Sequence, residues 1–346
     1  MSTRPLVSIG LFLYNGDRFL EAAIESILNQ TFKDFELIIS DNCSTDRSDE
    51  ICRRYAAQDS RIRYYRNERN MGAGWNIRRV YELATGKYFK QAAHDDMIQP
   101  DYLRQCVDAL EADESLVLAH SLTRVIDENG QFIENYDDGT RTSSLDPVVR
   151  ARDLLLTGHR CYPIFGLIRL DALHKLPPQG SYAHSDRVLL LQLGLLGRYY
   201  EVPEYLFIST KHMHQSVWTM PERTKAKGFR LTKRAGTLPA MEWWDPTKSR
   251  NIVFPEWNLA KEFWLSVAHS PLTLWQKVRC YALVLRWMWK YHRRMGKDLL
   301  VAADQVLFNF QNRHTIAAHA TTPPQATETS SKIVSLDLNT SGGESL

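Results

Sequence analysis

Strand-like and helix-like stretches alternate along the first two thirds of the chain, and this alternation limits the possible folds more than any other feature. Residues 6–13 form an apolar run typical of a buried strand, and residues 19–28 place apolar side chains at helical spacing. We expect further strands at 35–40, 62–65, 87–93, 116–126, 163–169 and 199–208, with helices from about 46, 74, 100 and 186. This order predicts an α/β fold, in which helices flank a mostly parallel sheet.

The character of the sequence changes twice after this alternation. From about residue 220 tryptophans accumulate and the periodicity becomes helical, and from about residue 315 the chain is rich in Ala, Thr, Ser and Pro. We therefore expect an α/β domain over 1–219, a helical, Trp-rich and basic region over 220–314, and a disordered tail over 315–346.

Composition excludes some classes of protein and partner. The hydrophobic fraction of 44% and the charged fraction of 24% are ordinary for a globular protein, and a net charge of +3 does not indicate a nucleic-acid partner. The five cysteines are odd in number and form no C-x-x-C pair, so we expect reduced thiols and a cytoplasmic location. No apolar run is long enough for a spanning helix, and the N-terminal apolar stretch suits a strand better than a signal peptide.

Polar or aromatic side chains follow four successive predicted strands. They are Tyr14 and Asn15, Asp41 and Asn42, Asn67 and Asn70, and His94, Asp95 and Asp96. In open α/β sheets, ligands bind outside the carboxyl ends of the strands, so this set predicts a ligand site. The solvent boundary at the edge of a sheet would produce part of the same pattern.

The adjacent carboxylates of Asp95 and Asp96 are a candidate metal site. Two such charges 4 Å apart repel by about 4 kcal/mol at an effective dielectric constant of 20. A divalent cation removes this repulsion, and carboxylate and phosphate oxygens are the ligands that Mg²⁺ or Mn²⁺ prefers. The alternative is a helix-capping turn before Pro100 and Asp101.

A chain of motifs over about residues 5–215 resembles the family 2 glycosyltransferases of GT-A fold. The motifs are Val7-Ser8-Ile9 with Tyr14-Asn15, Gln30-Thr31-Phe32 with Asp34-Phe35-Glu36-Leu37-Ile38-Ile39, Asp41-Asn42 with Ser44-Thr45-Asp46, Asn70-x-Gly72, Ala84-x-Gly86-Lys87-Tyr88, and Asp95-Asp96 before Pro100-Asp101-Tyr102-Leu103. The resemblance implies a Rossmann-like GT-A domain. It also implies a nucleotide-sugar donor, with a UDP-sugar favoured, and Mn²⁺ or Mg²⁺ as cofactor.

The resemblance also assigns roles at the donor site. Tyr14 would stack on the nucleobase, Asp41 would contact the base or ribose, Asp95 would lie near the ribose and diphosphate, and Asp96 would bind the metal. The remaining residues assigned to the donor are Asn15, Asn42, Asn70 and Asn76. The usual D-x-D triplet is His94-Asp95-Asp96 here, so its first carboxylate is missing, and His94 is as much a packing candidate as a ligand.

The family places a catalytic carboxylate at the start of a later helix, often in a Glu-Asp pair. Asp186 occupies that context, with Ser185 in place of the Glu. Since Asp is a favoured N-cap residue, a capping role is the alternative. A histidine after the last strand meets the metal or diphosphate in many relatives, which makes His212 and His214 candidates, with His212 better placed.

The chemistry implied is direct, inverting displacement: Asp186 deprotonates an acceptor hydroxyl of a glycan, glycolipid or small molecule. A sugar nucleotidyltransferase is the rival enzyme, although its glycine-rich, basic N-terminal loop is absent. A non-catalytic nucleotide-sugar-binding protein is the other alternative. Without G-x-G-x-x-G or a P-loop motif, a dinucleotide-dependent oxidoreductase or a P-loop enzyme is disfavoured.

Residues 271–297 combine seven cations with aromatic side chains and no acidic residue. The cations are Lys277, Arg279, Arg286, Lys290, Arg293, Arg294 and Lys297. A helix of this kind could lie on the inner face of an anionic membrane, which would make the protein peripheral there. It could equally pack on the catalytic domain with solvated cations, or form a homodimer contact.

Overall fold

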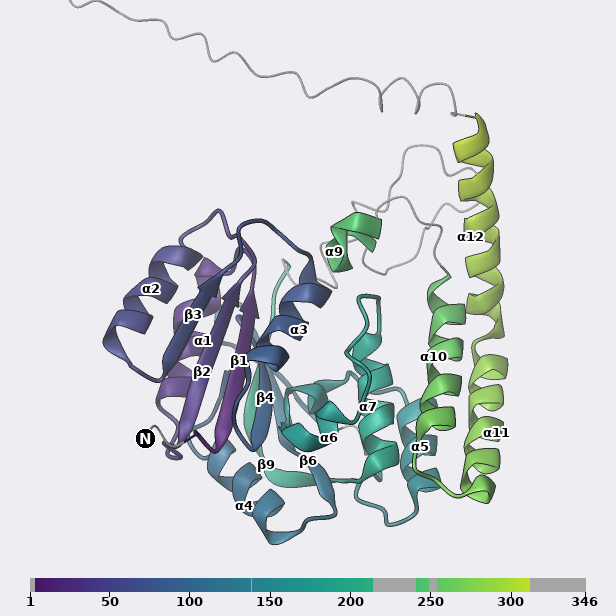
Figure 1. The fold of residues 1–346 in the computed structure, drawn as a ribbon, viewed down its shortest axis with the longest axis horizontal. Helices are drawn as coiled ribbons and strands as arrows, with labels where there is room; N and C mark the ends of the chain where they lie inside the picture. The colour runs from purple at the N-terminus through teal and green to yellow at the C-terminus, as the bar shows by residue number, and fades with distance from the viewer. Residues whose placement is uncertain (1–3, 138, 214–240, 249–253, 312–346) are drawn as a thin grey trace, which may run out of the picture.

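The computed structural model describes residues 4–137, 139–213, 241–248 and 254–311. A nine-stranded sheet runs through it in the order β3-β2-β1-β4-β8-β6-β9-β5, with β7 paired to β6 (Figure 1). The strands are β1 (Val7–Leu13), β2 (Phe35–Asp41), β3 (Ile62–Arg66), β4 (Tyr88–Ala93), β5 (Met97–Ile98), β6 (Leu116–Asp127), β7 (Phe132–Tyr136), β8 (Leu167–Arg169) and β9 (Arg198–Lys211).

The N-terminal part of this sheet is parallel. Strands β3, β2, β1 and β4 all run in one direction, and the register places Leu13 opposite Asp41 at their carboxyl ends. Strand β8 then enters antiparallel to both β4 and β6, whereas β6 and β9 are parallel to each other. The expected α/β architecture is confirmed, and beyond β4 the sheet is mixed.

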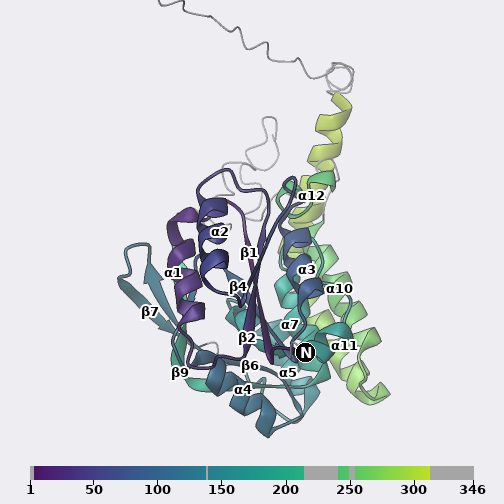
Figure 2. The same cartoon turned by 60° about the vertical axis from the view of Figure 1, so that its left-hand side comes forward.

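Helices cover both faces of the sheet, as Figure 2 shows for α1 and α2 on one side and α3 on the other. The helices are α1 (Asp17–Leu28), α2 (Ser48–Gln58), α3 (Ala73–Leu83), α4 (Tyr102–Ala112), α5 (Pro147–Leu156), α6 (Leu170–His174), α7 (Ser185–Leu196), α9 (Met241–Trp244), α10 (Pro255–His269), α11 (Leu274–Lys290) and α12 (His292–Gln311). Ile9 and Leu11 share a buried cluster with α1, α2 and α4, whereas Ile38 and Phe89 pack against α3 from the opposite face. This follows from the two-residue alternation of side chains along a strand.

Two expected elements differ in the structure. The strand predicted over 163–169 begins as a 3₁₀ turn, η1 (Tyr162–Phe165), after Cys161 in the left-handed region (φ 64°), and only β8 is extended. The helix expected from Pro100 begins at Tyr102 instead. Gln30 explains its position, because Gln30 Oε1 accepts from the Leu103 N–H (3.0 Å) and Nε2 donates to the Gln99 carbonyl (2.8 Å).

The described part of residues 220–314 is helical and packs on the α/β domain. The single helix expected over 271–297 is two helices, α11 and α12, which meet at Tyr291. Cys280, Val284 and Trp287 on the inner side of α11 share a buried cluster with residues of α5 and α7. The boundaries expected at 219 and 314 and the tail over 315–346 lie outside the described residues, so this domain division stays a prediction. No helix in the described ranges is long and apolar enough to cross a membrane.

One cation is buried within the sheet. The side chain of Lys90 on β4 is 1% exposed, and its Nζ donates to the Phe165 carbonyl (2.6 Å) while lying 4.8 Å from the centre of the Tyr102 ring. Burial disfavours the charged ammonium and lowers the pKa of Lys90 to about 8.

This burial predicts a pH-dependent stability difference for Lys90→Met. Between pH 8 and 10 the unfolded chain binds more protons at Lys90 than the folded one, so this group raises the wild-type free energy of unfolding as pH rises. The variant lacks the effect. Its free energy of unfolding minus that of the wild type should therefore fall by about 2 kcal/mol from pH 8 to pH 10 in urea titrations. A pH-independent difference would contradict the assignment.

Candidate functional site

The loop after β2 is organised around the buried carboxylate of Asp41. Its Oδ1 accepts from the Ser44 N–H (2.9 Å) and hydroxyl (2.5 Å), and its Oδ2 accepts from the Tyr64 hydroxyl (3.0 Å). The Arg66 guanidinium lies 3.5 Å from the same Oδ2. Asp41 is 0% exposed, so in this structure it shapes the loop, and its contact with a base or ribose stays a prediction.

A network of asparagine side chains connects this loop with the start of α3. Asn76 Nδ2 donates to the carbonyls of Ser40 (2.9 Å) and Leu13 (3.3 Å), and the Ser40 hydroxyl donates to Asn76 Oδ1 (2.6 Å). Asn42 Nδ2 donates to Asn70 Oδ1 (2.8 Å). Asn42 and Asn76 are buried, whereas Asn70 is exposed. Asn76, assigned to the donor from the sequence, thus lies beneath the strand ends and bonds to the protein.

The turn after β1 presents an aromatic ring. Tyr14 is 44% exposed, and the next residue, Asn15, has a φ of 52°. Asn15 Oδ1 accepts from the Thr45 N–H (2.8 Å), which joins this turn to the loop after β2. A Cβ added to Gly16 would lie 2.3 Å from the His94 ring, so His94 packs directly on the turn. The tyrosine is therefore accessible for stacking, and His94 has the packing role that the sequence left open.

At the end of β4, Asp95 and Asp96 occupy different surroundings. Asp95 Oδ2 lies 3.0 Å from His212 Nε2, and the His212 ring packs against Phe19 at 4.6 Å between ring centres. Asp96 Oδ1 accepts from the Thr210 N–H (3.1 Å) on β9. The structure thus brings His212 to Asp95, whereas the resemblance placed Asp96 at the metal and a histidine at the metal or diphosphate. His214 lies outside the described residues.

The electrostatics of the two carboxyl groups also differ. Burial is the largest single influence on Asp95 and opposes its ionisation, but the hydrogen bond with His212 and the nearby charges of His94 and His212 together lower the pKa of Asp95. Burial, reinforced by the Asp95 charge, raises the pKa of Asp96 well above the ordinary value for an aspartate. The pKa values of two neighbouring carboxyl groups move apart in this way, because once one group is ionised its charge opposes ionisation of the other.

Asp186 lies in the first turn of α7, and the capping alternative for it is wrong. The N-cap residue is His184, at a φ of 65°, and Asp186 Oδ1 accepts from the adjacent Arg187 N–H (2.8 Å). Ser185, which replaces the family's glutamate, is buried, and its hydroxyl accepts from Gln179 Nε2 (3.1 Å). Asp186 is therefore not the N-cap residue of α7, and its carboxylate bonds to an N–H in the first turn of its own helix.

The loop before α7 and a short distant segment both pack on the start of α3. A Cβ on Gly74 would lie 2.2 Å from Ser181 Oγ, and a Cβ on Gly72 (φ 85°) would lie 2.6 Å from the Trp244 carbonyl oxygen. The segment carrying α9 thus covers the 70–72 loop, although about 170 residues separate them in the sequence. Trp244 was not among the site residues predicted from the sequence. Gly72, which tolerates both the positive φ and the close approach of Trp244, is the one residue in the sequence that could have indicated this contact.

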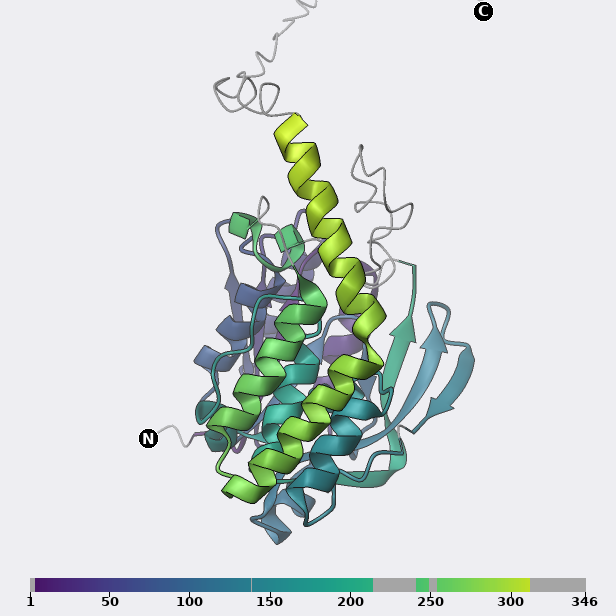
Figure 3. The same cartoon turned by 90° about the vertical axis from the view of Figure 1, so that its right-hand side faces the viewer.

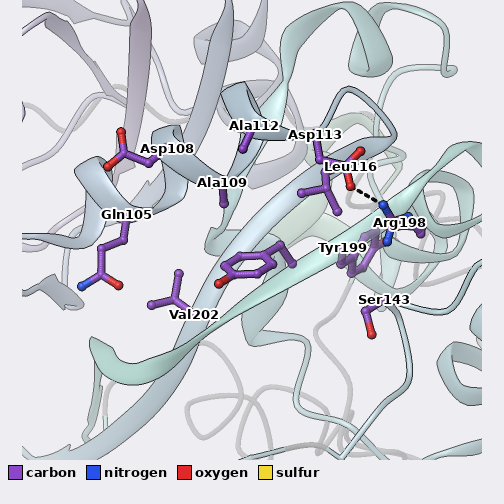
Figure 4. Close-up of a pocket in the computed structure, with 11 residues that line it drawn as sticks. Gln105, Asp108, Ala109, Ala112, Asp113, Leu116, Ser143, Arg198, Tyr199 and Val202 are labelled. Atoms are coloured by element: carbon purple, nitrogen blue, oxygen red, sulfur yellow. Dashed lines mark hydrogen bonds and ion pairs between the residues drawn. The ribbon is translucent and has the colours of Figure 1, made fainter.

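A cavity in the described part of the chain lies elsewhere. It has a volume of about 540 Å³, and Gln105, Ala109, Asp113, Arg198 and Tyr200 are among its lining residues (Figure 4). An ion pair between Asp113 and Arg198 borders it. The cavity is at the amino ends of β6 and β9 and contains none of the predicted site residues. The candidate site therefore remains at the opposite, carboxyl ends of the strands.

Known glycosyltransferases resemble the N-terminal half of the chain. Residues 8–176 match the model of glycosyl transferase family 2. An uncharacterised glycosyltransferase of Methanocaldococcus jannaschii is 36% identical over 135 residues, which are 38% of this chain and 47% of that protein. Chondroitin synthase of Escherichia coli is 35% identical over 194 residues, which are 53% of this chain and 28% of that protein. The chain thus spans less than half the length of these curated relatives.

The solved structures show the fold. S. aureus TarS residues 1–349, crystallised with UDP-GlcNAc, superpose with a TM-score of 0.58 at 17% identity, covering 82% of this chain and 73% of that chain. The structure of the same TarS segment with UDP has a TM-score of 0.56. The GT-A fold expected from the resemblance is confirmed.

Asn76→Ala should destabilise the protein, because it removes the hydrogen bonds to the buried Ser40 hydroxyl and to the carbonyls of Ser40 and Leu13, although the Leu13 carbonyl keeps the Asn42 N–H. We expect a loss of about 3 kcal/mol in the free energy of unfolding, measured by chemical denaturation. The control is Asn135→Ala on exposed β7, which should change stability by less than about 0.5 kcal/mol. Equal effects of the two changes would refute the structural role of Asn76.

Proposed function

We propose, from the membership of residues 8–176 in glycosyl transferase family 2, that the chain transfers a sugar from a nucleoside-diphosphate sugar to an acceptor hydroxyl. A UDP-sugar is the favoured donor. The observation that carries the proposal is that candidate site residues from several strands lie at the carboxyl end of the sheet. There, Asp95 after β4 meets His212 after β9 and the exposed Tyr14 follows β1, while the loop before Asp186 packs against the start of α3.

The residues at the end of β4 fit a divalent cation. Mg²⁺ and Mn²⁺ are commonly held by one or two protein ligands together with substrate phosphates and water, so a large protein cage is not needed. Within the described ranges no three His, Cys, Asp or Glu side chains gather as a metal site. We propose Asp95 and His212 as the ligands, because Asp95 Oδ2 and His212 Nε2 lie 3.0 Å apart. Oδ1 of Asp96, in contrast, already accepts a hydrogen bond from the Thr210 N–H. Bound there, the metal would neutralise the charge of the departing nucleoside diphosphate.

The metal proposal predicts different behaviour for the two neighbouring aspartates. Calorimetry should show UDP binding at least about tenfold more tightly with Mn²⁺ than with a chelator, a difference of about 1.4 kcal/mol. Asp95→Asn and His212→Gln should each remove most of this difference, because each removes a ligand. Asp96→Asn is the matched control and should keep it. The reverse result, in which Asp96→Asn loses the Mn²⁺ effect and Asp95→Asn keeps it, would identify Asp96 as the metal ligand.

Asp186 is the proposed general base. As the acceptor oxygen attacks the anomeric carbon, its proton passes to the Asp186 carboxylate, and the bond from that carbon to the diphosphate oxygen breaks on the opposite face. The configuration at the anomeric carbon is therefore inverted, without a covalent glycosyl-enzyme. The left-handed turn at His184 and the hydrogen bond from Gln179 to Ser185 hold the start of α7 that presents Asp186.

Asp186→Asn should lower kcat by about 10²–10⁴-fold, because an amide cannot accept the proton. The Kd for UDP and the melting temperature should stay near the wild-type values. Asp171→Asn, at an exposed position of α6, is the matched control and should leave all three quantities unchanged. Near-wild-type turnover of Asp186→Asn would exclude Asp186 as the base.

A second measurement separates the alternative functions. If the wild type binds UDP but turns over no sugar in a panel of nucleotide-sugar donors, the non-catalytic alternative applies. Formation of a nucleotide sugar with pyrophosphate would indicate a nucleotidyltransferase.

The acceptor class, a possible homodimer and the cytoplasmic location remain predictions. The five cysteines on which the location was based are all free thiols in the structure, four of them buried.

A further inference from the structure

Helix α11 has an outer stripe that no other part of the described chain covers. Together with α10 it forms the outermost layer on this side of the molecule (Figure 3). The inner side of α11 is occupied by the buried Cys280, Val284 and Trp287. The outer stripe, at spacings of three or four residues, consists of Trp275, Val278, Arg279, Ala282, Leu285, Arg286, Trp289 and, at the start of α12, Arg293.

The apolar members of the outer stripe are strongly exposed. Trp275 is 69% exposed, Trp289 78%, Leu285 55% and Val278 49%. Single exposed apolar side chains are ordinary on a protein surface, but four on one side of one helix form a contiguous patch, and such patches mark interaction sites.

The charged members of the outer stripe are all cations. Arg279 lies 3.5 Å from Asp146, whereas Arg286 and Arg293 have no ion pair with any carboxylate in the described ranges. Residues 271–297 contain no acidic residue at all. Arg286 and Arg293 therefore present positive charge without an ion pair in the described ranges beside the apolar side chains of the stripe.

We propose that the outer stripe is a docking surface for an anionic lipid bilayer. Tryptophan prefers the boundary between headgroups and acyl chains, and a helix that places cations beside such residues lies in the plane of the interface. A second copy of the chain suits the stripe less well, because a two-fold contact would place Arg279, Arg286 and Arg293 opposite the same arginines. Docking would hold the whole protein at the bilayer, since the inner side of α11 shares its core with α5 and α7.

The test is co-sedimentation of the full chain with vesicles. One set contains phosphatidylglycerol and phosphatidylcholine in equal amounts, and the other contains phosphatidylcholine alone. We expect binding to the first set only, together with a blue shift of tryptophan fluorescence and a loss of binding at high salt. Each arginine contributes about fivefold, so Arg279→Gln with Arg286→Gln and Arg293→Gln should lower partitioning about 100-fold.

The matched control neutralises three exposed cations on other helices and loops, Lys33→Gln, Arg53→Gln and Lys175→Gln, and should change partitioning far less. Trp275→Ser with Trp289→Ser should weaken binding at every salt concentration at which the wild type binds.

Equal binding to both vesicle sets, no binding, or equal losses in stripe and control variants would overturn the proposal. A dimer in solution that the tryptophan variant dissociates, without vesicle binding by the wild type, would make the stripe a subunit interface instead. Salt titration of the wild type keeps the test decisive if a variant fails to fold.

Discussion

The backbone at the carboxyl ends of β1 and β2 is buried, so its carbonyl groups need hydrogen-bond partners away from water. Asn76 Nδ2 donates to the carbonyls of Leu13 and Ser40, of which the Leu13 carbonyl also accepts from the Asn42 N–H, and the Asn76 side-chain oxygen accepts from the Ser40 hydroxyl. Because Asn76 belongs to α3, a single side-chain amide ties that helix to both strand ends. The loops that border the candidate site begin at these ends, and their positions depend on this contact.

Other long-range contacts bring the remaining parts of the site to the same edge. Gln30, at the end of α1, bonds to both sides of the turn that starts α4. The ring of His94 packs on Gly16, which holds the β4 end against the start of α1. Asp95 and Asp96 follow His94 directly, and their carboxylates point to different partners, Asp95 to His212 and Asp96 to the Thr210 N–H on β9.

The C-terminal helices extend the core of the α/β domain. The Phe263 ring on α10 packs edge-to-face on Trp287 of α11 at 5.1 Å, and both side chains are buried with residues of α5 and α7. One side of α11 is therefore committed to the protein interior, and the two exposed tryptophans necessarily face outward on the other side.

The sequence by itself determined the order of the strands and helices, the carboxyl-end location of the polar residues, and the family motifs. Hydrophobic periodicity and local spacing carry this information, since both depend on neighbouring residues. Only the tertiary structure decided that Asn76 is buried beneath the strand ends, that His212 meets Asp95 instead of Asp96, and that His184 is the N-cap of the helix bearing Asp186. It also decided that Trp244 covers Gly72. The physical reason is that each of these results depends on contacts between segments distant in sequence or on a left-handed backbone turn, and neither produces a periodic signal in the chain.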